Sequence, residues 1–182
     1  MNAPLRKMMT VGEFVLWADG RRGRWELIDG VPVGMSPQRA HHRRIKAGMF
    51  EALQSAVRAA GLACHAEPDG ATVRIDDYTA FEPDALVYCG PELPGESIEV
   101  PNPVIVVEVL SPSTSARDLD LKLKGYFQLA SVHHYLILDP VHRTVAHHRR
   151  TVSGSIATPT TGFCRLDPPG LDLDLGLVFS QS

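Results

Sequence analysis

The stretch that decides the fold is Pro-Val-Ile-Val-Val-Glu-Val-Leu, residues 103–110. A short, continuous run of β-branched residues is typical of a strand that is buried on both faces of a sheet. The Ser-Pro pair that follows breaks the run, and apolar residues at helical spacing then predict a helix over Ser115–Ala130. A second buried strand is expected at His134–Leu138. A buried strand, a helix and another buried strand predict a layered domain of helices and sheet.

Upstream, the same reasoning predicts a helix, a hairpin and a longer helix. A capping box formed by Thr10 and Glu13 opens a helix over Met9–Ala18, and Asp29-Gly30 is a strong hairpin turn signal. The longer helix is expected at Ala40–Ala60. Strands are expected at Trp25–Gly30, Val31–Met35, Ala63–Glu67, Thr72–Ile75, Ala85–Tyr88 and Thr144–His148, with one edge strand in the tail Gly162–Ser182. The fold class is therefore α/β or α+β, with a mixed sheet flanked by helices in a single domain over residues 10–182, after an N-terminal extension of residues 1–9.

The composition is that of a soluble globular domain. Of 182 residues, 44% are hydrophobic and 21% are charged, which excludes a disordered chain, a collagen and a long coiled coil. No apolar run is long enough to span a bilayer or to act as a signal peptide, so we expect a cytoplasmic protein without a membrane partner. The three cysteines are widely spaced and lack a C-x-x-C pair, which disfavours a disulfide framework or a zinc site and favours small buried hydrophobes.

Basic residues gather at the start of the long helix. The net charge of −3 does not by itself indicate nucleic-acid binding. The local cluster comprises Arg39, His41, His42, Arg43, Arg44 and Lys46. Such a segment can bind a phosphate backbone. An ordinary solvated surface explains the cluster equally well from composition alone.

Two carboxylates stand where turn chemistry explains them poorly. Glu108 interrupts the apolar strand, and Asp84 follows Pro83 directly before another apolar strand. At the ends of neighbouring strands they can hold a hard divalent cation. Without it they would repel by ~4 kcal/mol at 4 Å and an effective dielectric near 20, so one of them should have a raised pKa.

Lys122 lies on the helix that follows Glu108, at the edge of its apolar stripe. It can reach back over the strand end to polarise a phosphate or hold an attacking water. It can also form an i,i+4 surface pair with Asp118, worth ~0.2–0.5 kcal/mol, and spacing alone favours this pair. Lys124 is expected to point nearer to solvent.

Several motifs in one order resemble a known family. They are Glu26–Gly30, Met35–Pro37, His42 with Ile45, Glu82–Asp84, Val107–Thr114, Asp118, Lys122, Tyr126 and Tyr135–Pro140. In that order and spacing they resemble the Uma-two family of restriction-endonuclease-like proteins, within the PD-(D/E)XK nuclease superfamily. The resemblance covers about Thr10–Arg150.

The resemblance implies a restriction-endonuclease-like core with one or two Mg²⁺ ions, or Mn²⁺, at the carboxylates. By position, Asp84 and Glu108 match the two acidic residues that hold the metal. Leu110 stands where the superfamily pattern has lysine, and Lys122 on the next helix matches the family's displaced lysine. Glu26 matches an early glutamate that is a further ligand or a base. His42 matches a family histidine for which the residues suggest no role.

The function expected on this basis is a Mg²⁺-dependent endonuclease that hydrolyses DNA, with Asp84, Glu108, Lys122 and Glu26 as catalytic residues. Its nucleic-acid-binding residues would be Arg39, His42, Arg43, Arg44 and Lys46, and a homodimer would suit cleavage of both strands. One alternative is a catalytically silent nucleic-acid-binding or interaction module that keeps the fold. Another is that the carboxylates only cap turns, which leaves Glu108 unexplained.

Overall fold

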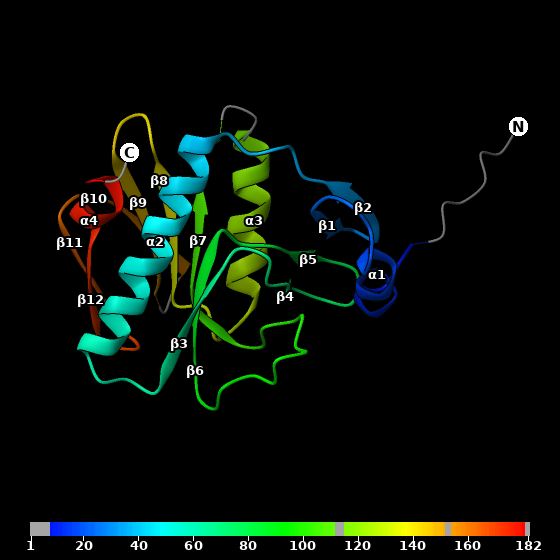
Figure 1. Ribbon diagram of the computed structural model, residues 1–182, viewed down its shortest axis with the longest axis horizontal. Coiled ribbons are helices and arrows are strands. Elements are labelled where there is room, and N and C mark those ends of the chain that lie inside the picture. Colours follow the sequence, from blue (N-terminus) through cyan, green and yellow to red (C-terminus); the bar gives the residue numbers. More distant parts are fainter. Residues whose placement is uncertain (1–7, 112–114, 152–153, 181–182) are drawn as a thin grey trace, which may run out of the picture.

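A computed structural model describes residues 8–111, 115–151 and 154–180 and shows a mixed α+β domain built on a six-stranded sheet (Figure 1). In chain order the elements are α1 (Val11–Ala18), β1 (Trp25–Ile28), β2 (Val31–Gly34), α2 (Ala40–Ala59), β3 (Cys64–Pro68), β4 (Val73–Arg74), β5 (Ala80–Phe81), β6 (Ala85–Cys89), β7 (Pro103–Val109), α3 (Ala116–Gln128), β8 (His134–Asp139), β9 (Thr144–Thr151), β10 (Gly154–Thr160), β11 (Phe163–Leu166), β12 (Leu171–Asp174) and α4 (Leu175–Ser180).

The six-stranded sheet has the order β10-β9-β8-β7-β6-β3. Strand β7 lies inside the sheet, as its β-branched sequence predicts. It is parallel to β8 and antiparallel to β6. Val107 lies opposite Ala85, and the Asp84 backbone N–H donates to the Val107 carbonyl at 2.9 Å. This register brings Asp84 beside Glu108, which is the next residue of β7.

Helices cover both faces of this sheet, with α2 and α3 on opposite sides (Figure 1). On one face, Met49 and Leu53 of α2 pack against Val107 and against the leucines of the β11–β12 hairpin and α4. On the other face, Tyr126 of α3 packs against Val106 and Tyr135. The mixed sheet flanked by helices is thus confirmed, with one hydrophobic core on each face of the sheet, and a third, smaller cluster packs α1 against β1 and β5.

A second, four-stranded sheet has the order β2-β1-β5-β4 and lies to the side of the main sheet (Figure 1). The predicted hairpin β1–β2 is confirmed: Asp29 and Gly30 both have positive φ, 48° and 73°, as a type I′ turn requires. The predicted capping box of α1 is also present, between Thr10 and Glu13. This small sheet carries Glu26 towards the end of β7.

The expectation for the tail was wrong. Instead of one edge strand, the tail forms a hairpin of two strands and a short helix. Leu171 and Leu173 alternate with exposed or half-buried aspartates and are fully buried against α2, which explains the Leu-Asp repeat. Strands β5 and β10 were not expected, and the proline of the Ser-Pro pair that was expected to break the chain after β7 lies outside the described residues.

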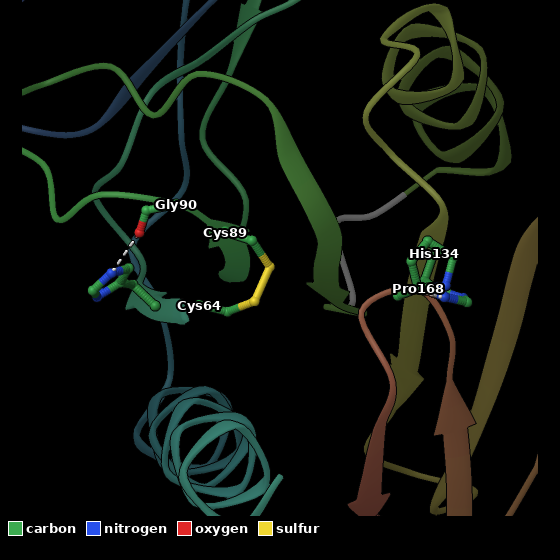
Figure 2. Close-up of a disulfide and its surroundings, with 6 residues drawn as sticks. Cys64, Cys89, Gly90, His134 and Pro168 are labelled. Carbon is green, nitrogen blue, oxygen red and sulfur yellow. Dashed lines mark hydrogen bonds between the residues drawn. A yellow bond between two sulfur atoms is a disulfide. The ribbon is translucent and has the colours of Figure 1, made fainter. Parts of the chain in front are cut away.

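The interpretation of the cysteines was also wrong. Cys64 and Cys89 form a disulfide across β3 and β6 (Figure 2), and only Cys164 is a free, buried thiol. The two thiols are 25 residues apart in sequence but directly opposite in the antiparallel register, which their spacing did not reveal. No helix within the described ranges is long and apolar enough to cross a membrane.

Candidate active site

Glu108 and Lys122 form the centre of the candidate site. Lys122 Nζ lies 3.0 Å from Glu108 Oε1 and 3.0 Å from Glu26 Oε1, so the ammonium bridges two carboxylates. The Tyr126 hydroxyl donates to the same Glu108 oxygen at 2.9 Å. Lys122 and Tyr126 are four residues apart on α3 and therefore share one face of the helix.

The two lysines of α3 have different environments. The Lys122 side chain is 5% exposed, whereas the Lys124 side chain is 71% exposed and pairs with Asp120 at 2.6 Å. Lys122 therefore pairs with Glu26 and Glu108 rather than with Asp118, whose backbone N–H is capped by Ser115. Lys122 can face the sheet because Gly125 lets α3 approach β5: a Cβ there would lie 2.5 Å from the Phe81 ring.

Asp84 is held on both of its oxygens. The Val109 backbone N–H donates to Oδ2 at 2.7 Å, and Lys46 Nζ lies 2.6 Å from Oδ1. Lys46 also lies 2.6 Å from Asp69 Oδ2, and it is 4% exposed. The lysine expected among the DNA-binding residues is thus a buried partner of Asp84.

A chain of ion pairs links Asp69 back to Glu26. Arg24 lies 3.2 Å from Asp69 and 2.6 Å from Glu82, and the Glu82 backbone N–H donates to Glu26 at 3.0 Å. We call the whole set the carboxylate–cation cluster. It contains five carboxylates (Glu26, Asp69, Glu82, Asp84, Glu108) and three cations (Arg24, Lys46, Lys122).

Burial sets the electrostatics of the cluster. It raises the pKa of Glu108 to about 8, with Lys122 opposing the shift and Asp84 and Glu26 adding to it. The raised pKa expected for one of the two carboxylates is therefore present, but desolvation rather than repulsion is its main cause. Burial would lower the pKa of Lys122, but Glu108 and Glu26 outweigh it and raise that pKa. Burial also raises the pKa of Glu82.

The remaining basic residues lie at the N-terminal end of α2. Arg39, Arg43 and Arg44 are exposed, as expected for a basic surface. His42 Nε2 lies 2.9 Å from the Val109 carbonyl. Because a carbonyl only accepts, Nε2 carries the proton, and the buried Nδ1 has no hydrogen-bond partner among the described residues. His42 thus donates to the backbone carbonyl of Val109, and Asp84 accepts from the backbone N–H of the same residue.

The donor chemistry of the cluster fits a hard divalent cation. In the part of the chain that the structure describes, no three His, Cys, Asp or Glu side chains form a metal-binding group by themselves. Mg²⁺ needs fewer, because it keeps several waters and binds proteins through one or two carboxylates plus substrate phosphates. When all five carboxylates are ionised, the cluster has two more negative than positive groups. One divalent cation would balance this excess of negative charge.

Several members of the cluster were missed by sequence reasoning. Asp69 precedes Gly70 and looks like an ordinary turn residue, and Arg24 lies in a basic segment. Glu82, and Tyr126 next to the cluster, stand out only as parts of longer motifs. Their partners are far along the chain, 58 residues for Arg24 and Glu82, so no local pattern indicates these pairs.

Comparisons with known proteins identify the family and the fold. The model of the Uma2 family, described as "Putative restriction endonuclease", matches residues 11–178. The chain belongs to the Uma2 family. No curated protein matches the sequence. The fold is similar to that of a crystal structure from Anabaena variabilis ATCC 29413, described as "a putative nuclease belonging to DUF820". The TM-score is 0.74 at 18% identity, over 95% of this chain and 98% of the other.

Membership of the Uma2 family confirms the resemblance found in the sequence. It indicates a nuclease of the restriction-endonuclease type, and the structural likeness shows that the fold is shared. The carboxylate–cation cluster lies at the end of β7, where ligands bind in many open sheets flanked by helices.

Proposed function

We propose that this Uma2 protein is a Mg²⁺-dependent endonuclease that hydrolyses DNA phosphodiester bonds at the carboxylate–cation cluster. Asp84 and Glu108 are the proposed metal ligands. When bound there, the ion would lower the pKa of a water molecule and neutralise charge on the scissile phosphate. The same sites would accept Mn²⁺, which also prefers oxygen ligands.

Lys122 is the proposed electrostatic catalyst. Its ammonium is fixed by two 3.0 Å contacts and is shielded from water, so it needs little reorganisation to stabilise charge that develops on phosphate. Glu26 orients it from the other side and is itself held by the Glu82 backbone N–H. In this arrangement Glu26 is a positioning residue or a base for the attacking water.

The observation that carries the proposal is the burial of so many ionisable groups at one strand end. Glu26, Asp84, Glu108, Lys46 and Lys122 are all less than one-tenth exposed. Taking such groups out of water is costly, and apolar residues of similar volume are often as stable or more stable. A catalytic role explains why the chain keeps these groups buried despite the free-energy cost. A catalytically silent module would not require them.

Plasmid cleavage tests the proposal. We expect the wild-type chain to nick or linearise supercoiled DNA with Mg²⁺ or Mn²⁺ and to lose this activity with EDTA. Asp84→Asn and Glu108→Gln should lower the rate by at least ~100-fold, because each removes a charged ligand. The matched control is Asp120→Asn, an exposed carboxylate on α3, which should retain full activity.

The alternative is the catalytically silent module. Duplex binding by the wild-type chain, without cleavage in Mg²⁺ or Mn²⁺ on any DNA form, would support that alternative and refute the endonuclease.

A homodimer is the assembly that would place one site on each strand, and sedimentation in the presence of DNA tests it.

A further inference from the structure

Lys46 is a buried lysine to which the nuclease proposal gives no task. Its ammonium lies 2.6 Å from Asp84 Oδ1 and 2.6 Å from Asp69 Oδ2. With the Gln38 amide oxygen turned toward it, a third contact of 2.7 Å completes the set. A lysine has three N–H donors, so all of them are used.

The two carboxylates that hold Lys46 are not equivalent. Asp84 is buried, and its other oxygen accepts from the Val109 N–H. Asp69 lies in the turn after β3, its side chain is 37% exposed, and it also pairs with Arg24. Lys46 therefore connects a proposed metal ligand with a carboxylate that is outside the proposed ligand set.

We propose that Lys46 is an internal counter-ion of Asp84 that a divalent cation displaces. The Lys46–Asp84 ion pair and metal binding at Asp84 then exclude each other, because two cations on one carboxylate oxygen repel strongly at low dielectric. This inference rests on the proposed function, since it takes Asp84 as a ligand.

The geometry provides for the displaced ammonium. A buried charge that loses its only partner is strongly destabilising, but Lys46 would keep Asp69 and Gln38. Asp69 is in turn held by Arg24. The metal-free protein thus keeps Asp84 neutralised, and the metal must break one ion pair in order to bind.

Mn²⁺ binding, followed by the electron paramagnetic resonance signal of the free ion, tests the exchange on the full chain without DNA. We expect Lys46→Met to bind Mn²⁺ about tenfold more tightly than the wild type, since no ammonium competes for Asp84. Asp69→Asn should bind it about tenfold more weakly, because the displaced ammonium has lost its charged acceptor. The control Lys124→Met changes an exposed lysine of α3 and should leave the Kd unchanged.

The opposite signs of the two effects separate this role from a structural one, which would weaken binding in both variants. Equal or weaker binding by Lys46→Met, with normal wild-type binding, would overturn the exchange but leave the metal site. No Mn²⁺ binding by any variant would overturn the metal site and the exchange together. If Lys46→Met does not fold, Asp69→Asn decides alone: unchanged or tighter binding refutes the exchange.

Discussion

Glu108 is the residue whose protonation the fold changes most clearly. Its pKa rises from an ordinary value of 4.5 to about 8, so between these values the folded chain holds a proton that the unfolded chain has lost. The free energy of unfolding must then fall as the pH rises from about 4.5 to about 8, and this contribution is constant outside that window.

Glu108→Gln removes this contribution, because the amide resembles the protonated acid and cannot titrate. We expect the variant to gain stability relative to the wild type as the pH rises through the window, measured by urea unfolding at several pH values. His134 and His147 have pKa values lowered mainly by burial, so their effect has the opposite sign, but it is common to both proteins and cancels. A difference that does not change with pH would contradict the prediction.

Lys122 contributes to the stability of the fold as well as to the proposed catalysis. The Lys122 ammonium is buried between Glu26 and Glu108. Lys122→Met should therefore lower the free energy of unfolding of the metal-free protein by ~3–5 kcal/mol, as expected when one partner of a buried pair is removed. Lys124→Met should cost less than ~0.5 kcal/mol, because its pair with Asp120 is exposed. Chemical unfolding of both variants without metal measures the difference, and equal costs would contradict it.

Among the elements, α3 depends on one glycine. A Cβ on Gly125 would lie 2.5 Å from Cε2 of Phe81, whose ring is buried and cannot swing away. Gly125→Ala should therefore push α3 away from β5 and lower the free energy of unfolding by ~1–3 kcal/mol. The shift of α3 should also lengthen the contact between Lys122 and Glu108.

Gly12→Ala is the matched control for Gly125→Ala. Gly12 lies in helix α1, and a Cβ on it would meet no described atom within 4 Å apart from its chain neighbours and the backbone of its own helix. Alanine there should therefore raise the free energy of unfolding by up to ~1 kcal/mol. Thermal unfolding of both variants is the measurement. Similar melting temperatures for the two would show that the α3–β5 approach is not tight.

Strands β3 and β6 are joined by the disulfide Cys64–Cys89, which closes 25 residues of chain. Its removal should lower the free energy of unfolding by about 3.5 kcal/mol. Urea unfolding with and without reductant measures this, and Cys64→Ser should match the reduced wild type. Thiol titration of the oxidised, unfolded chain should find one free thiol, Cys164; three would show that the bond is absent.

The sequence predicted those elements and site residues that local chemistry determines. The Asp29-Gly30 turn, the capping box of α1 and the run of β7 were all found where expected. Glu108 stood out because a charge within an apolar strand needs a reason. The Cys64–Cys89 bond and the Asp69–Lys46 pair depend on strand register and helix placement, which no local pattern encodes.

For the whole molecule, the basic end of α2 is the proposed contact for DNA. Replacing Arg43 and Arg44, both exposed, with glutamate should weaken duplex binding and reduce the salt slope by ~0.9 for each phosphate that the variant no longer neutralises. Arg58→Glu is the control, because it lies on the same helix ~20 Å away. Fluorescence anisotropy at several salt concentrations is the measurement. Unchanged binding after the double charge reversal would favour a merely solvated surface.

The ion pairs of the carboxylate–cation cluster also determine the order in which the chain can fold during synthesis. All five carboxylates precede α3, and Lys122 is the last of its charged groups to be made. A ribosome-bound chain that ends before α3 would have to bury Glu26 and Glu108 without their shared cation, which is strongly unfavourable. The carboxylate–cation cluster is therefore completed only after Lys122 has left the exit tunnel. No N-terminal piece that ends before α3 can assemble the whole carboxylate–cation cluster.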